Sequence, residues 1–247
     1  MMRHWFISNF PLATQFVRAA RAQRLAKQQR ETWSQHGEDI WLRDHLPAKP
    51  HPDWIYVDVG ANHPITLSNT FRLYQAGYRG YTVEPNLDLV QVHRIVRPED
   101  ICIPVCASDA PALLKFFVHP DHLLSGRADS ETGVKTEGGT VIAVPGIPLD
   151  TLLADDPRMI AMLSVDVEGA EDAVLKGAVT ALERVLFLII EVSTPTNTGE
   201  PDYSMHRHML PDYFELIDTL GANAIYVNRR VQAAAAEFLS SAKVAIS

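Results

Sequence analysis

Short apolar runs alternate with amphipathic segments along most of the chain. Apolar runs rich in β-branched residues predict buried strands, and apolar positions spaced three and four apart predict helices. The predicted strands cover residues 54–59, 80–85, 100–108, 112–118, 159–169, 184–192 and 223–228, and the predicted helices cover 67–78, 87–96 and 170–182. This order predicts a doubly wound α/β fold, with a mostly parallel central sheet and helices on both faces.

Polar stretches divide the chain around this core. Residues 1–50 are expected to form a helical appendage, 51–230 the main domain and 231–247 a helical or frayed tail. Residues 119–140 and 195–205 are polar loops, and residues 205–221 predict a helix followed by a short strand. Long loops in a compact domain are often functional, so these two are expected to form much of the substrate pocket.

The charge distribution limits the partners. The formal net charge of −8 argues against a nucleic-acid partner, which needs a basic face. Residues 1–30, however, contain six basic residues and no acidic one. This segment is interpreted as a solvated helix packed on the domain or on a second subunit of a homo-oligomer. The alternative is a helix that contacts an anionic membrane.

Cysteine content and hydropathy bear on location. Cys102 and Cys106 lie in one apolar run and are poorly placed for a disulfide, which suits a reducing compartment. No apolar stretch is long enough to span a bilayer. The sequence therefore predicts a cytoplasmic protein, peripheral at the inner membrane face if the N-terminal helix binds lipid.

Acidic side chains follow nearly every predicted parallel strand, and in such folds ligands bind beyond the carboxyl ends of the strands. They are Asp58, Glu84, Asp109 (after Ser108), Asp166 and Glu191. The first turn contains Gly60 but no further glycines, and Pro64 removes a backbone donor. Phosphates need amides and cations, so the site favours a cationic nucleoside such as S-adenosylmethionine over NAD.

Four stretches, "YVDVGAN", "VEPN", "CASD" and "SVDVEGAE", with "SQHGEDI" before them, resemble the FkbM family of S-adenosylmethionine-dependent methyltransferases. The resemblance extends from Trp33 to Asn228. It implies a Rossmann-like class I methyltransferase fold that methylates a hydroxyl oxygen. The acceptors it implies are sugars, glycans, glycolipids or polyketide-type products.

The resemblance also implies roles for individual residues. Asp58, Gly60 and Asn62 would contact the methionine end of the cofactor. Glu84 would bind its ribose, and Ser108 and Asp109 would bind its adenine. Asp166 would lie beside the reacting centre. Many members carry an Ile-Gly-type turn where this chain has His63 and Pro64. Ser68 and Asn69 are expected to supply contacts that this turn does not.

Methyl transfer to an alcohol requires a base or a metal ion. Asp166 and Glu191 end neighbouring predicted strands and are candidate Mg²⁺ ligands. The alternative is that Asp166 contacts cofactor or substrate while Glu191 caps a loop. His63 and His206 are candidate bases, with a structural hydrogen bond to the loop backbone as the alternative for His63.

Two other functions compete with a methyltransferase. An NAD-binding oxidoreductase lacks support because glycines are missing and acids line the site. A non-catalytic nucleoside-binding module would not need an acid at the end of each strand. The sequence therefore favours an O-methyltransferase acting on a glycan or another small-molecule acceptor.

Overall fold

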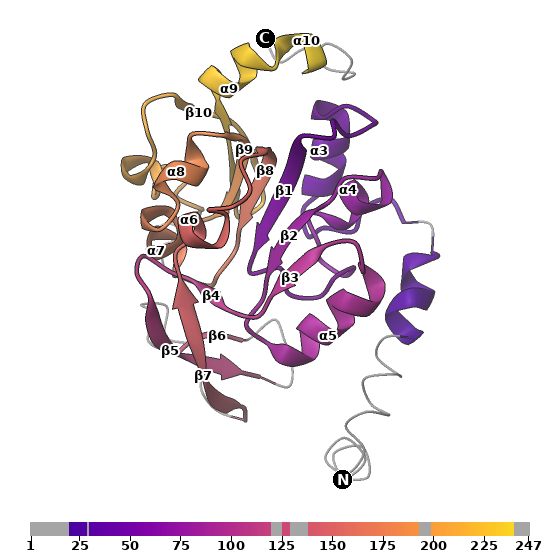
Figure 1. The fold of residues 1–247 in the computed structure, drawn as a ribbon, viewed down its shortest axis with the longest axis vertical. Coiled ribbons are helices and arrows are strands. Elements are labelled where there is room, and N and C mark those ends of the chain that lie inside the picture. The colour runs from indigo at the N-terminus through magenta and orange to yellow at the C-terminus, as the bar shows by residue number, and fades with distance from the viewer. Residues whose placement is uncertain (1–19, 29, 120–124, 129–137, 193–198, 240–247) are drawn as a thin grey trace.

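The computed structural model describes residues 20–28, 30–119, 125–128, 138–192 and 199–239. A seven-stranded sheet forms the centre of the molecule (Figure 1). Its strands are β1 (Trp54–Val59), β2 (Gly80–Val83), β3 (Ile101–Ile103), β8 (Met159–Val165), β9 (Val185–Glu191), β10 (Phe214–Leu220) and β11 (Asn223–Asn228). The order across the sheet is β10-β11-β9-β8-β1-β2-β3.

The strand order contains the reversal expected of a doubly wound fold. Strands β9, β8, β1, β2 and β3 are parallel, while β11 is antiparallel to both β9 and β10. The chain moves from β1 outward to β2 and β3, and then returns to the other side of β1 with β8. The carboxyl ends of β1 and β8 therefore meet at the switch point, where ligands bind in such sheets.

Helices cover both faces of the sheet, as predicted. One apolar cluster joins the sheet to α6 (Leu149–Leu152), α7 (Glu171–Lys176) and α8 (Val179–Leu182). A second cluster joins the opposite face to α3 (Glu38–His45), α4 (Phe71–Gln75) and α9 (Arg229–Ala234). β1 supplies alternate side chains to the two clusters, for example Tyr56 to the second and Val57 to the first. The α/β fold class is confirmed.

Two further helices complete this arrangement. Helix α5 (Leu87–Val96) packs against β3, and its Val92 joins a small cluster with Phe71 and Trp33. The short α10 (Ala236–Leu239) follows α9 at the end of the described chain (Figure 1). Within the residues that the structure describes, no helix is both long and apolar enough to cross a membrane.

A second, smaller sheet lies between β3 and β8 in sequence and was not predicted. It contains β4 (Cys106–Ala107), β5 (Ala112–Val118), β6 (Gly126–Arg127) and β7 (Thr140–Ile147), in the order β4-β7-β5-β6. The prediction of one strand over residues 100–108 was wrong. The chain leaves the central sheet after Ile103, at Pro104, which cannot donate a ladder hydrogen bond, and β4 then pairs with β7.

Three predicted helices are also shorter, divided or absent. The helix predicted over residues 67–78 forms only over Phe71–Gln75. The predicted helix over residues 170–182 is divided at Gly177, where a Cβ would lie 2.0 Å from the backbone oxygen of Ser108. The segment 205–221 contains a single 3₁₀ turn, Arg207–Met209, followed by the seven-residue β10, in place of a helix and a short strand.

Some predictions fall on residues outside the described ranges. Residues 20–26 are helical, but most of the basic segment 1–30 is not described. Of the loop 119–140, only 119, 125–128 and 138–140 are described, and residues 193–198 before and within the second loop are not. The division into appendage, domain and tail stays a prediction.

Candidate functional site

A pocket of about 310 Å³ opens at the switch point of the central sheet. Its walls come from the turn after β1, the ends of β2, β8 and β9, the second sheet, and a residue preceding α3. Four of the predicted strand-end acids line it, namely Asp58, Glu84, Asp166 and Glu191. The structure therefore brings together side chains separated by more than a hundred residues.

The turn after β1 needs glycine for two reasons. Gly60 has a φ of +78°, in the left-handed region that side chains disfavour. A Cβ at this position would lie 1.7 Å from the backbone oxygen of Asp166, so the chain after β8 passes directly over it. The amides of Gly60 and Ala61 both donate to the Val83 carbonyl, at 3.0 and 3.2 Å. The turn is thereby fixed to both neighbouring strands.

Glu84 is held at the end of β2 by two backbone donors. Its carboxylate accepts from the amide of Asn62 at 2.8 Å and from the amide of Asn86 at 2.7 Å. Burial raises the pKa of Glu84 to about 7, although these two amides oppose the shift. The carboxylate is oriented and keeps unused lone pairs on the pocket side, which suits the hydroxyls of a ribose.

Asn62 offers an unsatisfied acceptor at the same position. It has a left-handed φ of +48°, and its side-chain Oδ1 is buried. Within the described residues, no hydrogen-bond partner reaches this oxygen. A buried polar atom without a partner is costly, so a ligand donor in the pocket would relieve that cost.

Asp58 and the residues after the turn form a linked group. The buried Asp58 carboxylate accepts from the Thr70 hydroxyl at 2.5 Å and from the hydroxyl of Ser164. Asn69 lines the pocket and donates to that Ser164 hydroxyl at 3.0 Å. Ser68 also lines the pocket, but its hydroxyl accepts from the amides of Thr70 and Phe71 at the start of α4.

Three carboxylates gather at the ends of β8 and β9. In Asp166, Glu168 and Glu191, one oxygen from each lies within 4.8 Å of the others. Desolvation at the pocket floor, followed by the charges of Glu191 and Glu168, raises the pKa of Asp166 well above its usual range. Desolvation and the neighbouring acids also raise the pKa of Glu168, to about 7. Glu168 was not predicted, and its φ of +56° is an unusual conformation for this residue type.

The acid next in sequence has a structural role. Glu171 is buried, and its carboxylate accepts from the amides of Val167 and Gly169, each at 3.1 Å. It thereby fixes the turn between β8 and α7 that carries Glu168. Acids in the first turn of a helix are also favoured by the helix dipole.

The structure does not bring every predicted site residue into the pocket. Ser108 and Asp109 lie outside its lining, because β4 turns into the second sheet and presents Cys106 and Ala107 instead. The hydroxyl of Ser108 donates to the carbonyl of Ala110.

The two predicted histidine bases also lie outside the lining. His63 Nδ1 accepts from the amides of Ile65 and Thr66, at 3.2 and 3.1 Å. His206 is buried, with Nδ1 2.7 Å from the carboxylate of Asp172 and Nε2 3.2 Å from the carbonyl of Glu191. Both rings are therefore used in contacts that shape the backbone around the site.

A strap of residues 32–37, preceding α3, supplies a residue that the sequence analysis missed. Gln35 is exposed and lines the pocket. The strap is fastened by the fully buried Asp39, which accepts from Thr32, Ser34, the Trp33 amide and Arg72. The Trp33 carbonyl accepts from the Ser68 amide at 3.1 Å, which links the strap to the turn after β1.

The second sheet adds a further wall. Phe116 on β5, Ser125 before β6 and Arg127 on β6 line the pocket opposite the central sheet. The amide of His119 donates to the Ser125 hydroxyl at 3.0 Å, which holds this edge together. The pocket thus joins the strand ends of β1 and β2 to an acidic recess at β8 and β9.

The strand order and this acid-lined pocket at the switch point define a doubly wound α/β fold with a ligand-sized pocket at the carboxyl ends of its strands. A family model described as the methyltransferase FkbM domain matches residues 58–221, more than half of the chain. The chain therefore belongs to the FkbM methyltransferase family. The match begins at Asp58, so it leaves out the strap and Gln35.

Comparison with solved structures gives a crystal structure of methyltransferase FkbM from Methylobacillus flagellatus KT. The two chains share 15% sequence identity with a TM-score of 0.45, and the alignment covers 87% of this chain and 60% of that one. This chain thus spans less than two thirds of that structure. Comparison with curated proteins gives no match.

Proposed function

We propose that the protein transfers a methyl group from S-adenosylmethionine to a hydroxyl oxygen of a sugar, glycan or glycolipid-type acceptor. The observation that carries this proposal is the acid-lined pocket at the switch point, where Asp58 and Glu84 stand at the ends of neighbouring strands. Carboxylates attract an ammonium group and accept from ribose hydroxyls, but they repel phosphates.

The residues present fit this cofactor. Glu84 would hold the ribose, while Asp58 and the unpartnered Oδ1 of Asn62 would face the amino-acid end. Gly60 keeps the turn free of a side chain, so that backbone and ligand approach closely. When bound, the cofactor supplies an electrophilic methyl carbon on a sulfonium.

The carboxylate recess fits the other half of the reaction. An acceptor hydroxyl must lose its proton as it is methylated. Desolvation and neighbouring acids raise the pKa values of Asp166, Glu168 and Glu191. The pKa of Glu168 is raised to about 7, so this carboxylate would accept a proton near neutral pH. The same three oxygen ligands would hold Mg²⁺, a hard cation, and a bound Mg²⁺ would acidify the hydroxyl. Gln35 and Arg127 stand on the walls where an acceptor would enter.

Calorimetric titration tests the cofactor. S-adenosylhomocysteine is expected to bind the wild-type protein, NAD is expected not to bind, and Glu84→Ala is expected to weaken S-adenosylhomocysteine at least tenfold. Binding of NAD in preference to S-adenosylhomocysteine would favour an oxidoreductase. Binding of S-adenosylhomocysteine without transfer to any acceptor would favour a nucleoside-binding module.

A transfer assay tests the acceptor. Incubation with S-adenosylmethionine labelled in the methyl group, a panel of methyl glycosides and glycolipid extracts, with and without Mg²⁺, is expected to label a hydroxyl of a sugar. Loss of label in EDTA would support the metal. Transfer to nitrogen or carbon acceptors alone would contradict the proposed O-methylation. Membrane contact through residues 1–30 and a homo-oligomer stay predictions, tested by liposome flotation and by light scattering.

A further inference from the structure

Two buried side chains, one on α5 and one at the C-terminal end of α5, bind the turn after β1. His93 and Arg97 lie four residues apart, so they share one face of the helix, and both are buried. His93 Nε2 donates to the carbonyl of Asn62 at 2.8 Å. Arg97 Nη2 donates to the carbonyl of Pro64 and to the Ser68 hydroxyl, the latter at 2.6 Å.

These contacts explain how a turn without the usual glycines keeps its shape. The Asn62 amide is bound by Glu84 and its carbonyl by His93. Pro64 has no amide to satisfy, and its carbonyl is bound by Arg97. The backbone that faces the amino-acid end of the pocket is therefore set by a buried cation on the far side of the turn.

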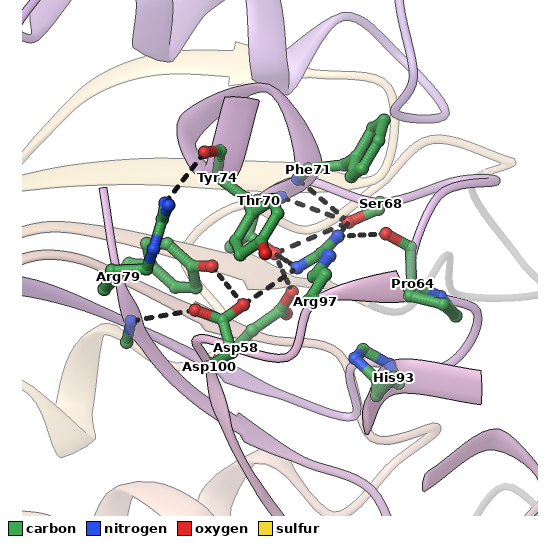
Figure 2. A network of polar contacts seen from close by, with 12 residues as sticks. Asp58, Pro64, Ser68, Thr70, Phe71, Tyr74, Arg79, His93, Arg97 and Asp100 are labelled. Atoms are coloured by element: carbon green, nitrogen blue, oxygen red, sulfur yellow. Dashed lines mark hydrogen bonds and ion pairs between the residues drawn. The ribbon is translucent and has the colours of Figure 1, made fainter. Parts of the chain in front are cut away.

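Arg97 also reaches the carboxylate that lines the pocket. Its Nη1 donates to the Thr70 hydroxyl at 2.8 Å, and that hydroxyl donates to Asp58 at 2.5 Å (Figure 2). Asp100 lies 3.8 Å from the same Nη1. The Arg97 side chain has no exposed surface, so its charge acts on Asp58 with little screening by water.

The charged and titratable groups around Asp58 come from several elements. Arg97 follows α5 and Asp100 precedes β3. Tyr56 lies on β1, and Glu84 follows β2. Burial raises the pKa of Asp58, and the Thr70 hydroxyl, Arg97 and the Ser164 hydroxyl lower it. Burial therefore opposes the ionisation of Asp58, while Arg97 favours it.

We propose that Arg97 is a positioning residue, which fixes the turn for the amino-acid end of the cofactor and, through the Thr70 hydroxyl, holds Asp58 opposite its ammonium group. The inference rests on the proposed function, because it assumes a cofactor with such an end. It adds a residue outside the pocket lining to those that determine cofactor affinity. According to this inference, affinity for the amino-acid end of the cofactor depends on Arg97, whereas affinity for the nucleoside end depends on Glu84.

Two probes separate these ends. S-adenosylhomocysteine carries the amino-acid group, and 5′-methylthioadenosine has the same nucleoside and sulfur without it. In Arg97→Gln, calorimetry is expected to show about a tenfold or greater loss for S-adenosylhomocysteine and about a twofold or smaller loss for 5′-methylthioadenosine. The variant-to-wild-type ratio of Kd for S-adenosylhomocysteine is expected to fall as pH rises, because the loss of Arg97 raises the pKa of Asp58 and higher pH restores its charge.

Matched variants guard against a merely structural effect. Thr70→Val keeps the cation but removes the hydroxyl between Arg97 and Asp58. It is expected to show the same selective loss of S-adenosylhomocysteine affinity, and it provides the test if Arg97→Gln does not fold. Arg184 is half-buried and donates to the carbonyls of Arg158 and Leu153, away from the pocket. Arg184→Gln is expected to lower Tm and leave both Kd values unchanged.

The outcomes distinguish the two proposals. No binding of S-adenosylhomocysteine by the wild-type protein would overturn the proposed function itself. Wild-type binding with equal losses for the two probes in Arg97→Gln and Thr70→Val would overturn only the positioning role. Unchanged affinity for S-adenosylhomocysteine in either folded variant would overturn it as well.

Discussion

The carboxylate recess is expected to reduce the stability of the protein when no divalent cation is present. Asp166, Glu168 and Glu191 lie within 4.8 Å of one another, and each has a raised pKa. A raised carboxyl pKa means that folding disfavours the charged form. Asp166→Asn keeps the shape of the side chain and removes one of the three charges, so it is expected to stabilise the protein in EDTA at pH 8.

The distance gives the size of this effect. Two unit charges 4.8 Å apart repel by about 3.5 kcal/mol at an effective dielectric constant of about 20. Asp166 and Glu168 are open to solvent in the pocket, so screening reduces the expected gain to about 1 kcal/mol. For a chain of this length, that gain corresponds to an increase of about 2–4 °C in Tm.

The sign of the pH dependence follows from the same values. The pKa of Glu168 is about 7 in the folded protein and 4.5 ordinarily. The folded protein therefore binds the Glu168 proton more tightly than the unfolded chain does. The stability that this proton contributes is fully present below pH 4.5 and is lost as pH rises through about 7. The gain from Asp166→Asn is expected to be largest at pH 8 and to disappear near pH 4.5.

Thermal melts at pH 8 and near pH 4.5, in EDTA and then in Mg²⁺, measure this effect. Asp212→Asn is a matched control, since its exposed carboxylate lies 3.9 Å from Arg207 and far along the chain from the recess. It is expected to change stability by no more than about 0.5 kcal/mol. Mg²⁺ is expected to raise the Tm of the wild-type protein but not of Asp166→Asn. An unchanged or lower Tm for Asp166→Asn at pH 8, or an equal gain at both pH values, would refute the reasoning.

Three other substitutions test separate parts of the pocket. Gly60→Ala places a Cβ 1.7 Å from a backbone oxygen, so it is expected to lower stability by about 3 kcal/mol or more in denaturant titrations and to abolish S-adenosylhomocysteine binding. Glu84 has a pKa of about 7, so wild-type affinity for S-adenosylhomocysteine is expected to rise about tenfold from pH 6 to pH 8, while Glu84→Gln shows a flat profile in calorimetry. Gln35→Ala is expected to leave Tm and the Kd of S-adenosylhomocysteine unchanged and to raise the KM of an acceptor found by the labelling screen; a change confined to kcat would contradict a role in acceptor binding.

The central sheet and its acids are predictable from sequence because their signals are local. Each parallel strand is a short apolar run with a polar residue at its end, and parallel strands place those ends at one edge. Asp58, Glu84, Asp166 and Glu191 line one pocket for this reason. Nothing in this inference requires knowing which strand neighbours which.

The second sheet depends on long-range pairing, which local patterns do not encode. Cys106 pairs with Gly146 across some forty residues of sequence, and this pairing draws the chain out of the central sheet after Ile103. That displacement moves Ser108 and Asp109 out of the pocket lining. The largely apolar run from residue 101 to 107 hides the break, and Pro104 is its one local signal.

The two histidines predicted as bases do not line the pocket, and the reason is a different one. His63 was proposed because it lies in the turn after β1, and His206 because it follows the second loop. In the structure, His63 Nδ1 accepts from two backbone amides, and the His206 ring contacts the Asp172 carboxylate and the Glu191 carbonyl. Gln35 has no chemical feature that distinguishes it in the sequence. Its position depends on the buried contact between Asp39 and Arg72, which are distant in sequence.

The two halves of the pocket are supported in different ways, and this difference has a functional consequence. The cofactor half is formed by the ends of β1 and β2 and held from behind by His93 and Arg97, so its geometry follows from the core of the fold. The acceptor half is walled by the strap and the second sheet, which lie before and between the strands of the central sheet. Substitutions at exposed pocket positions of these segments, such as Gln35, can reshape the acceptor wall without displacing Glu84 or the turn after β1.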